Sequence, residues 1–185
     1  GFSMRKFRFN EQQRKLWVVL VFLIRIILLS IPLYLILWAN PSFDSLRYAV
    51  RDDVLLAAKM AGIEPDVDGF VLNLNTVDGP VIIDIAADCT GWKSVVAYLA
   101  LVLAVPGVSN KKRLIGLIGI PILYIVNVAR IAFLLWVVVN EGFGYFLVFH
   151  EYLWKLGLSF AVFIAWYFWL TKIAGKIKTE KFISY

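Results

Sequence analysis

Three side chains that could act together in covalent catalysis occur in three separate apolar segments of this chain. Cys89 is its only cysteine, His150 is its only histidine, and Arg130 lies within a long apolar stretch. An imidazole can take the proton of a thiol, the thiolate can attack a carbonyl carbon, and a guanidinium can stabilise the resulting oxyanion. A fold that brings the three together would therefore have the groups needed for cysteine-based acyl transfer.

Arg130 is the least expected of these groups. A charge near the middle of a membrane span costs at least about 2.5–3.5 kcal/mol, so its side chain must face a partner, the protein interior or water. Asn127 lies three residues earlier and thus on the same helical face. The pair is either a structural clamp between helices or a site for an anion or a transition state, and we favour the second interpretation.

Cys89 alone would be an ordinary buried thiol in most proteins. Here it stands near the start of a predicted helix, where the helix dipole favours the thiolate and free backbone N–H groups can bind an oxyanion. Thr90 and Gly91 follow and are small enough to leave room for a substrate backbone, whereas the charge of Asp88 opposes the thiolate. We therefore expect an activated thiol.

His150 is the candidate base, and either Glu151 or Asp84 could orient its ring; the sequence leaves that choice open. One histidine and one cysteine among scattered carboxylates do not make a zinc site, so neither a metal nor another cofactor is expected.

Four apolar blocks are long enough to cross a bilayer, and 61% of the 185 residues are hydrophobic. The predicted fold class is a membrane all-α bundle of about four transmembrane helices with a small extracytoplasmic helix and a β-hairpin. The predicted spans are residues 16–38, 86–106, 114–139 and 145–173, separated by residues 39–85, 107–113 and 140–144 and flanked by residues 1–15 and 174–185.

Most basic residues fall on one side of this four-span arrangement, which places both termini in the cytoplasm and the site at the extracellular face of the cell membrane. They are Arg5, Lys6, Arg8, Arg14, Lys15, Lys111, Lys112, Arg113, Lys172, Lys176, Lys178 and Lys181. Basic residues that set the topology and contact anionic lipid headgroups are enough to account for the net charge of +6. No nucleic-acid partner is therefore expected. Residues 1–3 resemble a tag remnant, and Leu16–Trp38 is too long for a cleavable signal, so it is expected to be a retained anchor.

The segment between the first two spans has its own pattern. Phe43–Met60 carries apolar residues at helical spacing, which predicts an amphipathic helix that either lies along the membrane interface or caps the bundle. Residues 70–75 and 81–85 alternate in polarity around Asp78-Gly79, which predicts a β-hairpin that leads directly to Cys89. If the third span ends near Asn140, Arg130 lies roughly 15 Å below that end. Either the site is sunk in the bilayer, or residues 140–145 dip into it.

Three short motifs in this order resemble the exosortase/archaeosortase family. They are Ala86, Cys89, Thr90 and Gly91, then Asn127 and Arg130, then Phe149, His150 and Glu151. The resemblance covers about a third of the chain, and the compact layout looks closest to an archaeosortase-like member.

The resemblance implies a membrane cysteine transpeptidase with Cys89 as nucleophile, Arg130 as stabiliser of the oxyanion or substrate, and His150 as acid/base. Its substrates would be exported proteins with a C-terminal hydrophobic sorting segment, and its acceptor a lipid amine. Two other functions stay open. One is a non-enzymatic transporter or assembly subunit that binds an anionic lipid or solute through Arg130. The other is an intramembrane protease that uses water as the acceptor.

Overall fold

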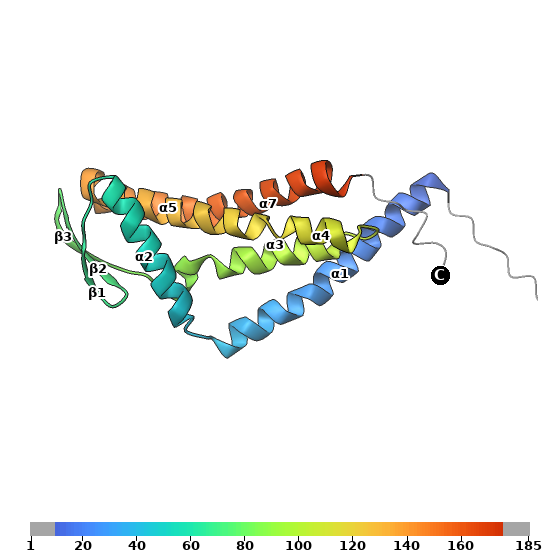
Figure 1. Ribbon diagram of the computed structural model, residues 1–185, viewed down its shortest axis with the longest axis horizontal. Helices are drawn as coiled ribbons and strands as arrows, with labels where there is room; N and C mark the ends of the chain where they lie inside the picture. The colour runs from blue at the N-terminus through green and yellow to red at the C-terminus, as the bar shows by residue number, and fades with distance from the viewer. Residues whose placement is uncertain (1–9, 176–185) are drawn as a thin grey trace, which may run out of the picture.

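The computed structural model describes residues 10–175, apart from the side chains of residues 154 and 155. This part of the chain is mostly helical and includes one small sheet (Figure 1). In chain order the elements are α1 (Glu11–Ala39), α2 (Asp44–Met60), β1 (Asp66–Asp68), β2 (Val71–Thr76), β3 (Gly79–Asp84), η1 (Ala87–Thr90), α3 (Trp92–Ala104), α4 (Asn110–Gly116), α5 (Gly119–Glu141), α6 (Phe143–Tyr152), η2 (Leu153–Gly157), α7 (Leu158–Phe168) and η3 (Trp169–Ala174).

Two helical stretches are long and apolar enough to cross a membrane, Glu11–Ala39 and Asn110–Glu141. Trp92–Ala104 and Leu158–Ala174 are apolar but shorter, so the expectation that four helices cross the membrane stays a prediction. The helix expected over residues 86–106 is trimmed at both ends. Of the predicted cytoplasmic segments, residues 1–9 and 176–185 lie outside the described part of the chain.

A cap covers one end of the bundle and consists of α2 and the sheet β1-β2-β3 (Figure 1). The predicted hairpin is present as β2 and β3, and β1 adds a third strand that the sequence pattern did not predict. Apolar side chains of α2 and the sheet meet the outer part of α5 in one hydrophobic cluster, whose buried members are Val50, Val54, Ala58, Ile63, Leu72, Leu74, Ile85, Ile131, Leu135 and Val138.

Arg130 lies next to the cap. The helix α5 continues to Glu141 and only Gly142 separates it from α6, so the loop expected over residues 140–144 is reduced to one residue. The turn of α5 that follows Arg130 is already packed against the cap through Ile131 and Leu135. Arg130 therefore lies where the membrane bundle meets the cap, and the protein itself covers the helix beyond it.

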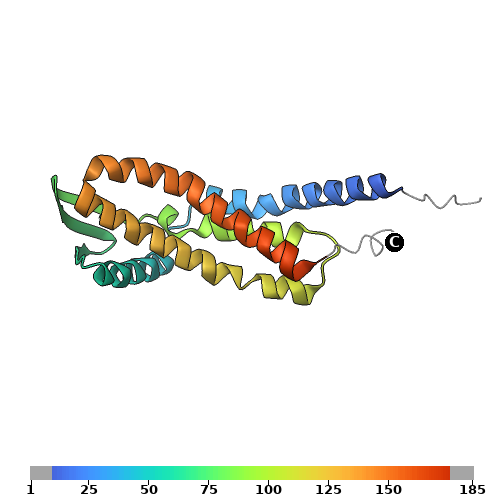
Figure 2. The ribbon, with the colours of Figure 1, turned by 90° about the horizontal axis from the view of Figure 1, so that it is seen from above.

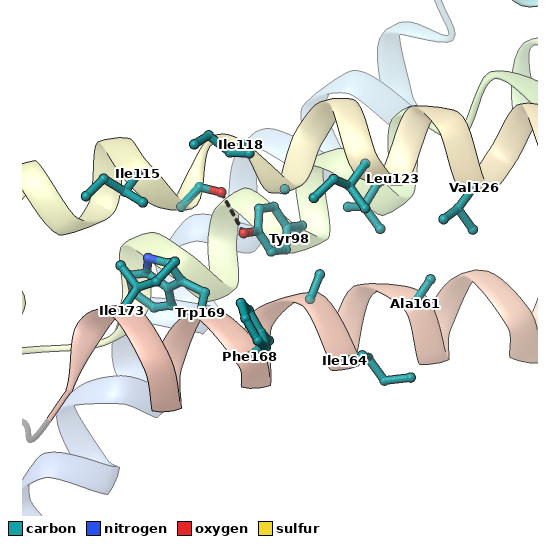
Figure 3. A pocket seen from close by; sticks show the side chains of 14 residues that line it. Tyr98, Ile115, Ile118, Leu123, Val126, Ala161, Ile164, Phe168, Trp169 and Ile173 are labelled. Carbon is teal, nitrogen blue, oxygen red and sulfur yellow. Dashed lines mark hydrogen bonds between the residues drawn. The ribbon is translucent and has the colours of Figure 1, made fainter.

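A second hydrophobic cluster holds the opposite half of the bundle, where α3, α5 and the continuous helix from α6 to η3 run side by side (Figure 2). The Tyr98 hydroxyl donates a 2.6 Å hydrogen bond to the Gly116 carbonyl, beside an apolar cavity of about 400 Å³ (Figure 3). A Cβ at Gly116 would lie 2.7 Å from Trp169 Nε1, so glycine is needed for this close packing.

Arg113 has a structural role that its place in a basic loop did not suggest. Its guanidinium Nη1 donates to the Leu103 carbonyl at 2.5 Å and its Nη2 to the Val105 carbonyl at 2.8 Å. These carbonyls belong to the end of α3, where the helix offers them no partner of its own. Arg113 thus closes the turn between α3 and α4.

Replacing Arg113 should destabilise the fold. Loss of charged hydrogen bonds to carbonyls typically costs about 2 kcal/mol, which corresponds to a drop of roughly 4–8 °C in the Tm of a chain of this size. Thermal unfolding of Arg113→Ala in detergent measures it, with Lys111→Ala as the matched control because Lys111 is an exposed basic residue of the same helix, α4. Equal Tm values for the two variants would contradict this role.

Candidate active site

A cavity of about 250 Å³ opens at the base of the cap and contains Cys89, Arg130 and His150 in its wall. The three come from η1, α5 and α6. Apolar side chains make up most of the remaining wall, together with Asp84: Ile82, Ile83, Ile85, Ile131, Leu134, Leu135, Phe143 and Phe146. A thiol, a guanidinium and an imidazole therefore share one small and largely apolar space.

Asn127 links two of these groups. Its Nδ2 donates a 2.7 Å hydrogen bond to the backbone carbonyl of Cys89, and its Oδ1 accepts a 2.8 Å hydrogen bond from Nη2 of Arg130. Asn127 is 1% exposed and Arg130 is 8% exposed. Because a buried amide with both ends satisfied is held in one orientation, it fixes the turn of Cys89 relative to α5.

Gly91 permits this contact. Its φ of 73° lies in the left-handed region, and a Cβ there would come within 3.2 Å of Asn127 Cγ. Any other residue would be strained in this backbone conformation and would press against the amide. The glycine therefore makes room for Asn127, and the room for a substrate backbone that the sequence suggested stays a prediction.

Arg130 keeps two hydrogen-bond donors unused. Its Nε and Nη1 are buried and have no partner within the described part of the chain. Buried donors of a charged group are normally satisfied, because leaving one unpaired costs free energy. These donors belong to a side chain in the cavity wall, so Arg130 is suited to bind a negatively charged or strongly polarised oxygen there.

The thiol differs from the expectation. Cys89 lies in η1, outside the long apolar helices, and burial raises the pKa of its thiol above the ordinary value. The backbone hydrogen bond with Ala86 and the Arg130 guanidinium lower that pKa, while the charges of Asp84 and Asp88 raise it. Desolvation is the largest effect and opposes the activation expected from the sequence, so a proton acceptor beside the thiol would help to form the thiolate.

His150 can reach this cavity from α6. Its ring stacks on that of Phe146 with 5.6 Å between the centroids, and both side chains line the cavity. Of its two suggested partners, Asp84 is also in the cavity wall but forms an ion pair with Arg47 at 3.6 Å, whereas Glu151 is exposed and outside the wall.

Thr90 is also outside this cavity. Its hydroxyl donates a 2.7 Å hydrogen bond to the Ala87 carbonyl, which closes η1. With Gly91 it lines a neighbouring cavity beneath α2 instead. Its hydroxyl therefore supports the turn that presents Cys89, and the room that Thr90 was expected to leave for a substrate backbone stays a prediction.

Sequence reasoning missed Arg47 of α2. Its Nε donates a 2.8 Å hydrogen bond to the Ile85 carbonyl, and its guanidinium lies 3.7 Å from the centroid of the Phe70 ring. It thereby fixes the chain between β3 and η1. The only signal was an arginine within an amphipathic helix, which normally indicates an exposed face.

The other parts of the described chain offer less chemistry. The apolar cavity of Figure 3 has Tyr98 as its one titratable side chain, and that hydroxyl is already hydrogen-bonded. Among the described residues, no group of three His, Cys, Asp or Glu side chains is placed to hold a metal ion.

Comparison with known families identifies the class of protein. The family model described as transmembrane exosortase matches residues 11–170, which is most of the chain. This protein therefore belongs to the exosortase family, which consists of membrane cysteine transpeptidases. Neither the curated proteins nor the solved structures that were searched contain a match to it.

The protonation of Cys89 can be measured directly. Alkylation by iodoacetamide should be slow near neutral pH and should rise only at a higher pH than for a free small-molecule thiol, because burial raises the thiol pKa. Arg130→Gln should move this rise to still higher pH, since it removes a positive charge that favours the thiolate.

Intact mass after timed alkylation gives the pH profile. Lys59→Gln is the control, because it removes a positive charge from the exposed end of α2. A profile that rises below that of the free thiol, or that is unmoved in Arg130→Gln, would contradict the assignment.

Proposed function

We propose that this protein cleaves exported proteins beside a C-terminal hydrophobic segment and transfers the new carboxyl end to an amine, with a membrane lipid as acceptor. One observation carries the proposal: Cys89, Arg130 and His150 line a single cavity. Membership of the exosortase family supports the reaction class.

The first half of the reaction forms a thioester. The imidazole of His150 takes the thiol proton of Cys89, and the thiolate attacks the carbonyl carbon of the scissile peptide bond. The carbonyl oxygen becomes an oxyanion. When the C–N bond breaks, the leaving amine takes the proton from the imidazolium, and the hydrophobic segment departs.

The second half reverses these roles. The acceptor amine attacks the thioester carbon, His150 removes a proton from the attacking amine, and the C–S bond breaks to give an amide. The sulfur regains its proton and the free thiol is restored. Water in place of the amine would give a carboxylic acid, which is the protease reaction.

Arg130 is suited to stabilise the oxyanion. Its unpaired Nε and Nη1 are fixed donors in a site of low polarity, where such hydrogen bonds are strong. The Asn127 contact holds the guanidinium in place before the substrate arrives. The apolar wall of isoleucine, leucine and phenylalanine side chains disfavours water, which lengthens the life of a thioester.

The membrane placement is part of the same proposal. Four crossings of the cell membrane with both termini in the cytoplasm put the cap on the outside. A substrate held in the bilayer by its own hydrophobic segment would then meet the cavity just above the lipid. In the described chain, the start of α1 and the end of η3 lie at the end of the bundle remote from the cap, in accord with this orientation (Figure 1). Within the family, the compact form favours an archaeosortase-like member.

Substitution of the nucleophile tests the reaction. An exported test protein with a hydrophobic and basic C-terminal segment, expressed together with this chain, should lose that segment and gain the mass of a lipid amine. With Cys89→Ala it should stay full-length, because no other group in the cavity can form a thioester. Equal abundance of the variant in the membrane controls for folding.

Processing by Cys89→Ala at the normal level would refute the nucleophile. It would favour the reading in which Arg130 only binds an anionic lipid or solute. A product with the mass of a free acid would instead identify hydrolysis.

The shape of the cation should also matter. Arg130→Lys keeps the charge but loses the planar set of donors, so processing should fall at least about tenfold. Initial rates by intact mass measure this. Lys93→Arg is a matched control, because Lys93 is partly exposed and paired with Asp88 at 3.1 Å. A rate for Arg130→Lys close to that of the unmodified protein would mean that charge alone suffices.

A further inference from the structure

We propose that the free edge of β3 is the docking strand for the substrate, and that the extended peptide before the scissile bond pairs with it in parallel. This inference rests on the proposed function and adds the mode of substrate recognition. Pairing with a sheet edge binds a peptide through its backbone, so it suits substrates that share a conformation more than a long sequence.

Strand β3 has one edge available for pairing. The sheet order is β1-β2-β3, so within the described chain β3 pairs only with β2. The register joins Thr76 to Gly79, Leu72 to Ile83 and Val71 to Asp84. In an antiparallel pair, alternate residues point their N–H and C=O groups toward the partner strand and the residues between point them away.

The phase of this alternation follows from two observations. The Ile85 N–H donates a 2.9 Å hydrogen bond to the Phe70 carbonyl, so Ile85 faces β2. A two-residue connection gives the same phase at the other end, where Gly79 faces β2. Counting in steps of two, Ile83 also faces β2, and Ile82 and Asp84 point their backbone N–H and C=O groups to the free edge.

That edge borders the cavity of Cys89. Four consecutive residues, Ile82 to Ile85, line the cavity. Successive side chains of a strand point to opposite faces, so contact with all four residues indicates that the cavity borders the strand edge rather than one face alone. The backbone donors and acceptors of the free edge are therefore available beside the thiol.

The position of proline agrees with this. Pro80 lies opposite Asn75, two residues before Ile82, so the nitrogen that lacks a hydrogen also points to the free edge. The part of the edge with both donors and acceptors is thus confined to Ile82 and Asp84, which are nearest to Cys89 in the chain.

The direction of the peptide follows from the topology. Strand β3 runs toward η1 and so toward the membrane half of the molecule. A substrate whose hydrophobic segment follows the scissile bond also runs toward the membrane, so its preceding residues lie parallel to β3. Pairing in this sense carries the scissile carbonyl past the end of β3 to the turn of Cys89.

Removing one donor from the edge provides the first test. Ile82→Pro deletes an N–H that β2 does not use, so processing of the tailed test protein should fall at least about tenfold. Asn73→Ala is the control, because Asn73 pairs with Ile82 from β2 and lies outside the cavity wall, so this variant should process within about threefold of the unmodified chain. Iodoacetamide labelling of Cys89 should be the same in both variants. Normal processing by Ile82→Pro, with Cys89 labelling intact, would overturn the proposal.

A disulfide test decides the question even if proline disturbs the cap. The Cys89→Ala chain contains no cysteine, so Ile82→Cys can be added and oxidised with test proteins that carry one cysteine at each position before the cleavage site. Neighbouring strands place paired Cβ atoms about 5 Å apart, so cross-links should form at the paired position. Asn73→Cys is the control, because Asn73 is the partner of Ile82 on β2, one strand further from the edge.

Capture by Ile82→Cys but not by Asn73→Cys supports docking. Equal capture by both, capture by neither, or a disulfide between two Ile82→Cys chains overturns it, the last because a second copy would occupy the edge. The test does not need catalysis. Processing without capture refutes the docking alone, whereas capture without processing by the unmodified chain refutes the transpeptidase.

Discussion

The side-chain amide of Asn127 ties the turn of Cys89 to the helix of Arg130, and the arrangement of the site depends on it. One end of the amide donates to the Cys89 carbonyl and the other accepts from the guanidinium. A buried amide so satisfied tolerates little movement, because rotation would break both bonds in a site without other partners. Cys89 is thus tied to α5 through its backbone carbonyl and not through its sulfur. The Arg130 guanidinium retains donors for a ligand.

A second constraint is the division of the molecule into two hydrophobic clusters. One fastens the cap to the outer part of α5, and the other fastens the helices of the opposite half. The polar groups of the site lie between them. A guanidinium in the middle of a long apolar helix is costly in lipid, but here the cap and the neighbouring helices surround it. The cap therefore contributes to the burial of Arg130 as well as to the shape of the site.

The chemistry-bearing residues were predictable from the sequence because rare groups in apolar blocks have few structural reasons to be there. Alternation around Asp78-Gly79 also predicted the hairpin. The strand β1 was not predicted, because its three residues are all exposed and show no alternation of polarity. The sequence pattern could not reveal which side of η1 faces which cavity. That depends on the left-handed conformation of Gly91 and its contact with Asn127, so the sequence could not show that Thr90 and Gly91 line the neighbouring cavity.

The connection between α5 and α6 consists of Gly142, whose φ of 92° turns the chain sharply. The Asp78 carboxylate packs on it and accepts a 3.3 Å hydrogen bond from the Phe143 N–H, which fixes the first turn of α6. A residue inserted there would separate Asp78 from the first turn of α6 and change the direction in which that helix leaves α5. Because α6 carries His150, the short connection and its Asp78 contact help to determine where the imidazole lies relative to Cys89 and Arg130.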